Sequence, residues 1–246
     1  MTARPAGGTR VLDRSLAMLF ELSEADEPLA IPELARRADL PSSTAYRLAD
    51  ELEGHGLIER DDGGLGLGLR ILELARRIED RLAPALLEPA RGIMRELARE
   101  HDETVLLTAP AGPFAIGLDS VEPPRTVRLS LGHWRVAPMY LGASGKALLA
   151  FLTPRAAERV LAALDGQAES LRRELAAVRE AGVVVTHGEL DPGVSGVAAP
   201  VLAPGGRPVA AVTLAGPTDR VGPQADRLSQ AVREAARAIE RALPGG

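Results

Sequence analysis

A run of small hydroxyl side chains followed by an arginine is the first feature of the chain that could do chemistry. Ser42, Ser43 and Thr44 are adjacent, and Tyr46 and Arg47 follow on the polar side of the same stretch. The first turn of a helix offers unpaired N–H groups and a positive dipole end, which suit phosphate. Recognition helices use such N-terminal side chains on base edges and on the DNA backbone. The set therefore predicts a nucleic-acid contact.

The same residues also have a simpler structural interpretation. Residues 42–44 could only cap a helix, and Arg47 could pair with Glu51 one turn later. For a serine cluster taken alone, capping is the more common role. The elements around the cluster decide between the two interpretations.

Two short helices, a glycine-bounded stop and a two-stranded wing are predicted between residues 31 and 68. Pro41 stands where the second helix begins, and Gly54 and Gly56 can adopt the left-handed conformation that ends it. Apolar residues recur at helical spacing, at Leu34, Ala35 and Ala38 in the first helix and Ala45, Leu48, Ala49 and Leu52 in the second. This helix–turn–helix–wing order favours the DNA contact over simple capping.

The predicted wing is weak. Residues 57–60 and 65–69 are plausible strands around the turn at residues 61–64. The second strand begins with alternating Leu and Gly and offers no side-chain donor. Only Arg60 could contact DNA from the wing, and its other interpretation is a solvated surface charge.

Lys146 is the only lysine in the chain and follows a glycine-rich turn at residues 142–145. A phosphate-binding P-loop would need glycine at Tyr140 and serine or threonine at Ala147, so that motif is excluded. Open N–H groups at the start of a helix can still hold a carboxylate. For Lys146 itself we favour a surface ion pair beside a tight strand-to-helix turn.

A serine hydrolase is an alternative from another class of function. Ser144 or Ser195, His187 and Asp191 could supply a nucleophile, a base and an orienting carboxylate. The chain has no Gly-x-Ser-x-Gly elbow, so this alternative ranks well below a DNA-binding protein. A third possibility is a ligand sensor whose N-terminal domain binds protein rather than DNA.

Residues 70–83 predict a linker helix, because a narrow apolar stripe runs along an otherwise charged stretch and suits pairing with a second copy of the chain. Pro84 is expected to end it.

Strands are predicted at 103–109, 114–121, 183–185, 196–201 and 208–214, with a further strand from Val127, Leu129 and Leu131, and helices at 86–100, 142–152, 154–164, 168–181 and 226–243. Strands with helices segregated around them predict an α+β domain.

Four segments resemble the IclR family of bacterial transcriptional regulators. They are residues 28–60, which resemble its winged helix-turn-helix, and residues 138–150, 188–201 and 209–217, which resemble its effector domain. Together the resemblance covers the chain from Arg10 to Leu243. It implies an α+β chain with a flexible arm at 1–9, a winged helix-turn-helix DNA-binding domain at 10–69, the linker helix at 70–83, and a GAF-like effector-binding and oligomerisation domain at 84–246.

The resemblance also implies the site residues. The residues implied to contact DNA are Ser42, Ser43, Thr44, Tyr46, Arg47 and Arg60, and those implied to surround the effector are Ala143, Ser144, Thr186, Val194, Gly196, Thr213 and Ala215. Thr186 replaces a frequent acidic residue, Gly196 a cysteine and Ala215 a serine of the family. These changes predict a wider, more apolar pocket and an effector larger or more aromatic than a two-carbon acid. His133 and Trp134 border that pocket or a subunit contact, or belong to the core.

Charge argues against a generic nucleic-acid binder. The net charge of the 246 residues is −5, and residues 1–70 hold eight arginines and no lysine against thirteen acidic residues. DNA binding must therefore come from a few arginines on one face. Modest affinity for each DNA-binding domain and a need for dimers follow from this.

The expected partners are double-stranded DNA with a near-palindromic operator and a small organic or aromatic acid as effector. The chain is also expected to assemble with further copies of itself, as a homodimer or a homotetramer. We favour repression over activation, and expect neither enzymatic activity nor a cofactor. The absence of cysteine excludes disulfides and thiolate metal sites, and no metal is expected. No apolar run approaches the roughly 20 residues that span a bilayer, and no signal-peptide core is visible, so the cytoplasm is the expected compartment.

Overall fold

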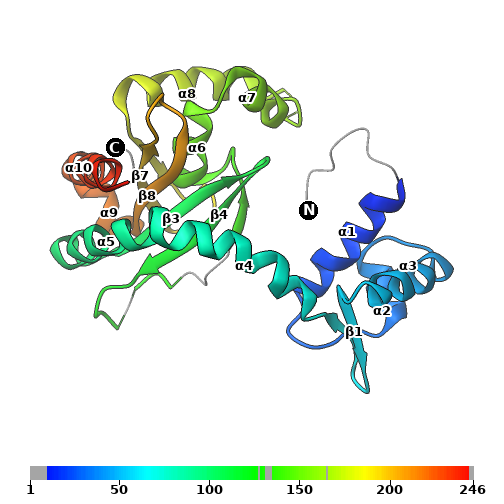
Figure 1. The fold of residues 1–246 in the computed structure, drawn as a ribbon. Coiled ribbons are helices and arrows are strands. Elements are labelled where there is room, and N and C mark those ends of the chain that lie inside the picture. The colour runs from blue at the N-terminus through cyan, green and yellow to red at the C-terminus, as the bar shows by residue number, and fades with distance from the viewer. Residues whose placement is uncertain (1–9, 127, 131–134, 165, 244–246) are drawn as a thin grey trace. The chain divides into compact units, whose positions relative to one another are not determined.

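The computed structural model describes residues 10–126, 128–130, 135–164 and 166–243 (Figure 1). The chain divides into two compact units, Met1–Arg81 and Leu82–Gly246. The predicted arm at 1–9 lies outside the described residues, as do Val127, Leu131, His133 and Trp134.

The N-terminal unit consists of helices and one hairpin around a small apolar core. Its elements are α1 (Arg10–Ser23), α2 (Ile31–Arg37), α3 (Ser42–Gly54), β1 (Ile58–Asp61), β2 (Gly64–Leu67) and α4 (Arg70–Leu82). Met18, Leu34 and Leu48 are fully buried and join the first three helices. Leu29 exchanges two backbone hydrogen bonds with Leu65, at 2.9 and 2.8 Å, which ties the segment before α2 to the hairpin.

Side-chain and glycine chemistry fixes the turns around α3 and the hairpin. Asp61 Oδ1 accepts hydrogen bonds from the N–H groups of Gly63 and Gly64, at 2.8 and 3.1 Å, as aspartate does in tight turns. Of the two glycines predicted to end α3, Gly56 has the positive φ, +70°, and Gly54 is the last helical residue. A side chain at Gly68 would place its Cβ 2.2 Å from the carbonyl oxygen of Gly56, so this crossing requires glycine.

The predicted linker helix is present, and its α-helical part ends at Leu82, just before Pro84. Helix α4 has no buried residue. What was not predicted is the π-helical turn, Ala83–Leu87, through which the chain continues into α5 (Glu88–His101). Proline removes one N–H and crowds the preceding turn. The wider π turn accommodates that loss without breaking the helical path.

The C-terminal unit is built on a six-stranded antiparallel sheet with the order β5-β4-β3-β8-β7-β6. The strands are β3 (Thr104–Ala111), β4 (Phe114–Val121), β5 (Val136–Pro138), β6 (Val184–His187), β7 (Val194–Leu202) and β8 (Pro208–Pro217), and the helices after α5 are α6 (Gly142–Phe151), α7 (Pro154–Leu161), α8 (Ala168–Ala181), α9 (Thr218–Val221) and α10 (Ala225–Ala242). The predicted α+β class is confirmed.

Helices cover both faces of this sheet (Figure 1), and each face has its own apolar core. Val197, Ala199 and Val201 of β7 pack toward α5 and α10. Ala198, between them in sequence, packs with α6, α7 and α8. The alternation follows from the two-residue period of a strand, and it places the start of α6 against the face opposite α10.

One predicted strand is wrong. Leu129, the described member of the strand expected from residues 127–131, lies in no strand. The sheet edge is instead β5, where Pro138 pairs with Phe114 and Val136 with Ile116. Three residues are too few to show alternation, so the sequence pattern could not indicate β5.

Candidate nucleic-acid interface and ligand cavity

The start of α3 exposes the hydroxyl cluster. Pro41 occupies the N-cap position, and no side chain caps the helix, so the interpretation of residues 42–44 as caps is wrong. Ser42 and Ser43 are exposed and Thr44 is partly buried. The hydroxyl groups and the first N–H groups of α3 are therefore available to a phosphate or a base edge.

Arg47 and Tyr46 lie on the same exposed face. Tyr46 is 48% exposed, and the Arg47 side chain is 57% exposed, with Nη1 2.9 Å from Glu51 Oε1. The predicted i,i+4 pair thus exists. Exposed pairs of this spacing contribute only about 0.2–0.5 kcal/mol, so an approaching phosphate can take Arg47 at little cost.

The opposite face of α3 explains why these polar groups point outward. Ala45, Leu48, Ala49 and Leu52 are buried at helical spacing and pack in the core of the N-terminal unit. Residues 43, 46 and 47, offset from this apolar stripe, must then face solvent. The apolar pattern of the helix thereby orients its chemistry.

Arg60 on β1 is held by acidic groups. Its Nη2 lies 3.0 Å from both Asp50 Oδ1 and Glu53 Oε2, and its side chain is 39% exposed. These contacts link the wing to α3 and neutralise two carboxylates beside the exposed face. They also compete with a direct DNA contact by Arg60.

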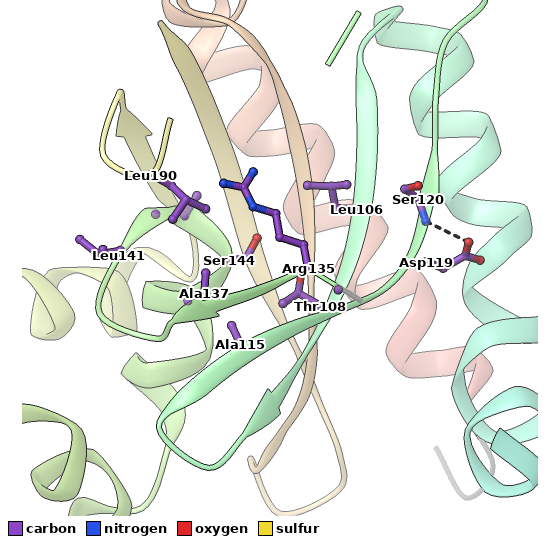
Figure 2. Close-up of a pocket in the computed structure, with 14 residues that line it drawn as sticks. Leu106, Thr108, Ala115, Asp119, Ser120, Arg135, Ala137, Leu141, Ser144 and Leu190 are labelled. Atoms are coloured by element: carbon purple, nitrogen blue, oxygen red, sulfur yellow. Dashed lines mark hydrogen bonds between the residues drawn. The ribbon is translucent and has the colours of Figure 1, made fainter. Parts of the chain in front are cut away.

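The C-terminal unit contains a cavity between β3, β4, β5, the start of α6 and the loop after β6 (Figure 2). Its lining residues are Leu106, Thr108, Ala115, Gly117, Asp119, Ser120, Arg135, Ala137, Leu141, Gly142, Ala143, Ser144, Gly145 and Leu190. The cavity volume is about 80 Å³, several times the ~10–15 Å³ that one water requires. A small organic molecule is therefore the appropriate size class.

Helix α6 directs its N-terminus at this cavity. Its N-cap residue, Leu141, makes no side-chain hydrogen bond to it, and its first N–H, that of Gly142, donates to Glu189 Oε2 at 3.2 Å. Within the described part of the chain, the N–H groups of Ala143 and Ser144 have no hydrogen-bond partner. Two free donors at the positive end of a helix form an anion-binding surface.

Arg135 is the cavity residue that sequence analysis missed. Figure 2 shows its side chain crossing the cavity toward Leu190, beside Ser144. Its Nη1 and Nη2 donate to Asp191 Oδ2 and Oδ1, at 2.7 and 2.8 Å. This two-point hydrogen bond lowers the pKa of Asp191 and raises that of Arg135, and it keeps both groups charged.

Two of the seven predicted effector residues, Ala143 and Ser144, line the cavity. The other five, Thr186, Val194, Gly196, Thr213 and Ala215, lie behind them on β6, β7 and β8. Ser144 Oγ lies 2.8 Å from Thr213 Oγ1. A Cβ added at Gly196 would be 3.2 Å from the Ala143 Cβ. The start of α6 therefore stands between these strands and the cavity, and they support its wall.

Lys146 is buried, which corrects the expected surface ion pair. Only 6% of the residue is exposed, and its Nζ lies 2.6 Å from Glu174 Oε1 and 2.7 Å from Glu189 Oε1. The other oxygen of Glu189 accepts the Gly142 N–H. Lys146 thus fixes the loop after β6 to the first turn of α6.

The hydrolase alternative fails on geometry. His187 Nδ1 is 2.8 Å from Ser195 Oγ, but Ser195 is fully buried and donates to Thr218 Oγ1 at 2.9 Å. Asp191, the carboxylate needed to orient the histidine, is bound to Arg135 instead. These residues therefore do not form a nucleophile, base and orienting acid.

Comparison with known proteins identifies the family. The model "IclR helix-turn-helix domain" matches residues 11–62, and "Bacterial transcriptional regulator IclR C-terminal" matches residues 84–241. The second match alone spans more than half of the chain. The chain therefore belongs to the IclR family of bacterial transcriptional regulators. This confirms the prediction of a transcriptional regulator with an N-terminal helix-turn-helix over that of an enzyme.

Individual relatives agree with this assignment. The chain is 30% identical to the HTH-type transcriptional regulator KipR of Bacillus subtilis, over 87% of this chain and 90% of KipR. It is 28% identical to the transcriptional repressor IclR of Escherichia coli, over 89% and 84%. An IclR homologue from Microbacterium hydrocarbonoxydans, solved with 4-hydroxybenzoate, is 28% identical with a TM-score of 0.72, over 95% and 98%. Among the described residues, no helix is long and apolar enough to span a bilayer.

Proposed function

We propose that this chain binds double-stranded DNA through the start of α3 and that an organic acid in the cavity controls this binding. The observation that supports the DNA contact best is the uncapped start of α3, with exposed hydroxyls and the easily released Arg47 beside it. The residues proposed to contact DNA are Ser42, Ser43, Thr44, Tyr46 and Arg47, with Arg60 at the wing. Arg60 contributes mainly by neutralising Asp50 and Glu53.

A second copy of the chain completes the DNA-binding unit in this proposal. Exposed apolar side chains lie on α1 and α4, namely Val11, Leu12, Leu16 and Phe20 on the first and Leu72, Leu74 and Ile78 on the second. Contiguous exposed apolar residues are typical of protein contacts. A homodimer would present two copies of α3 to a near-palindromic operator, and a homotetramer would pair two such dimers.

The effector proposed for the cavity is an organic acid larger than two carbons. The cavity offers its carboxylate two sets of donors, the free N–H groups of Ala143 and Ser144 and the guanidinium of Arg135. The apolar lining residues Leu106, Leu141 and Leu190 suit an apolar or aromatic body. Gly196 lets α6 lie close to the sheet, since an added Cβ there would be 3.2 Å from the Ala143 Cβ. The homologue solved with 4-hydroxybenzoate supports this class of effector.

Repression of a gene near its own, in the cytoplasm, is the mode of action that we propose. The relative from Escherichia coli is named a repressor. Ligand occupancy would alter how the two DNA-binding domains are held, which is a coupling free energy between two sites.

A gel shift with DNA flanking the gene of this chain tests the proposal. The full chain should shift this DNA at low salt in the presence of competitor. Arg47→Ala should weaken DNA binding by about fivefold or more, since a phosphate or base contact by arginine is worth about 1–3 kcal/mol. Arg207→Ala, an exposed arginine of the C-terminal unit, is the matched control. The proposed interface would be contradicted if Arg47→Ala and Arg207→Ala bound the DNA with the same affinity in the gel shift.

A further inference from the structure

The loop between β6 and β7, residues 188–193, forms one wall of the cavity. It begins and ends at glycines with positive φ, Gly188 at +65° and Gly193 at +80°. Three side chains between these glycines contact the site. Leu190 lines the cavity, Glu189 binds Lys146, and Asp191 binds Arg135. The loop is therefore held by side chains at its centre, and its ends are closed by the Gly188 N–H, which donates to the Val194 carbonyl at 2.8 Å, and by the Gly193 carbonyl, which accepts from Thr218.

The two ion pairs that hold the loop differ in accessibility. Lys146 is 7% exposed at its side chain and has two carboxylate partners, so it is a fixed anchor. Arg135 and Asp191 are each 35% exposed. Water reaches the second pair, and a solute in the cavity can reach it as well.

Among the described residues that line the cavity, Arg135 is the only cationic one. The acidic lining residue, Asp119, is 2.9 Å from Arg91 Nε and thus has its own partner. A guanidinium presents two parallel donors that match one carboxylate. In the present state that carboxylate is supplied by the chain, by Asp191, and an acid in the cavity would compete for the same two donors.

We propose that Asp191 is an internal competitor of the effector. In this proposal, which rests on the proposed effector site, the carboxylate of the effector replaces Asp191 on Arg135. Arg135 thereby selects acids over neutral analogues. The released Asp191 frees the centre of the 188–193 loop, while Lys146 continues to hold Glu189.

The loop leads directly to elements beyond the cavity. The Thr218 N–H of α9 donates to the Gly193 carbonyl at 2.9 Å, and the Thr218 hydroxyl accepts from Ser195 at the start of β7. Exchange at Arg135 therefore acts on the connection between β7 and α9. The chain offers a physical path by which occupancy changes the C-terminal unit, without any movement of α6.

An alternative binding mode makes the proposal testable. The acid could sit at the free N–H groups of Ala143 and Ser144 and leave the Arg135–Asp191 pair intact. In that mode Asp191 would be a spectator or would repel the ligand only weakly. The two modes differ in how Asp191→Asn changes the affinity for an acid relative to its amide.

Titration calorimetry with 4-hydroxybenzoate and 4-hydroxybenzamide distinguishes the modes. We expect wild type to bind the acid more tightly than the amide. Asp191→Asn should bind the acid at least fivefold more tightly than wild type does, with unchanged affinity for the amide. Arg135→Gln should lose the preference for the acid. Asp191→Ser is the second variant should the asparagine retain a hydrogen bond to Arg135. The proposal would be overturned if both Asp191 variants bound the acid no more tightly than wild type. It would also be overturned if neither wild type nor either Asp191 variant bound the acid.

Hydrogen exchange provides an independent readout of the loop. Saturating 4-hydroxybenzoate should speed exchange of amides in residues 188–193 of wild type, and Asp191→Asn should show this faster exchange without ligand. Slower exchange of the loop upon binding would contradict the exchange of partners. The DNA gel shift does not depend on these results, so failure of the competitor proposal and failure of the DNA interface are separable.

Discussion

The two units of this chain use charged residues in opposite ways. In the N-terminal unit the Arg47 side chain is 57% exposed and its partner Glu51 is 58% exposed. In the C-terminal unit Lys146 is 7% exposed and lies between two carboxylates. The first arrangement leaves a cation free to change partners, whereas the second fixes a loop to a helix.

This difference follows from what each region must do. A DNA contact needs cations that release their present partners at little cost, and exposed pairs satisfy this. A cavity needs walls of fixed geometry, and a buried pair that is broken on one side leaves an uncompensated charge. Arg135–Asp191 is intermediate in exposure, which suits the exchange that we propose for it.

Loss of Lys146 should give the largest effect. Lys146→Met leaves Glu174 and Glu189 without their shared cation. Because these carboxylates are 40% and 30% exposed, we expect a cost at the lower end of the range for broken buried pairs, about 3 kcal/mol, in the stability of the C-terminal unit. Denaturant dependence of hydrogen exchange in α6 and α8 measures it. Arg47→Met is the control in the N-terminal unit, with an expected change below about 0.5 kcal/mol. Similar effects of both variants would remove the contrast between the units.

A methyl group at Gly145 should have the next largest effect. Its Cβ would lie 2.5 Å from the carbonyl oxygen of Met139, a backbone atom that cannot easily move. We expect Gly145→Ala to destabilise the C-terminal unit by about 1–3 kcal/mol. Gly92→Ala in α5 meets no atom within 4 Å and should stabilise by about 0.5–1 kcal/mol. Urea unfolding measures both, and a Gly145 variant as stable as wild type would show that the tight turn before α6 is not rigid.

Much of the fold was predictable from the sequence, because long helices and strands carry a clear apolar period. The buried stripe of α3 and the alternation of β7 both follow from it. Strand β5 was not predictable, since three residues show no period. The π turn after α4 was not predictable either, because a proline such as Pro84 ordinarily interrupts a helical path.

The sites were only partly predictable. The exposed start of α3 follows from local spacing. Arg135 and Asp191 are 56 residues apart, and no local pattern indicates that they meet. Lys146 finds its partners 28 and 43 residues away, and lysine is rarely buried unless paired. The sequence therefore indicated a surface position for a residue that tertiary contacts bury.

His101 provides a smaller effect, visible as a pH dependence. Its Nε2 is buried and has no hydrogen-bond partner among the described residues. Burial lowers the pKa of His101 from its usual 6.5. The negative charge of Glu100 raises this pKa, and the positive charge of Arg227 lowers it further. The folded state then binds fewer protons than the unfolded state, so stability is full above about pH 6.5 and is lost as pH falls. His101→Gln should flatten this acid slope in thermal unfolding from pH 7.5 to 5.5, and an unchanged slope would contradict it.

The smallest expected effect is that of Glu51→Gln on stability. The exposed pair with Arg47 contributes at most about 0.5 kcal/mol, so thermal unfolding should be almost unchanged. DNA affinity should rise, because Arg47 no longer has a competing carboxylate. Fluorescence anisotropy measures the affinity, and weaker DNA binding by Glu51→Gln would show that the pair positions Arg47 for the duplex.

Coupling between the cavity and DNA is the most direct test of the account. Anisotropy would measure the affinity for DNA flanking the gene with and without the acid that gives the largest thermal shift. Calorimetry would measure the affinity for that acid with and without the DNA. We predict that the two affinities change by the same factor, of at least about fivefold. An acid that binds in the cavity and leaves DNA affinity unchanged would contradict control of the regulator by this site.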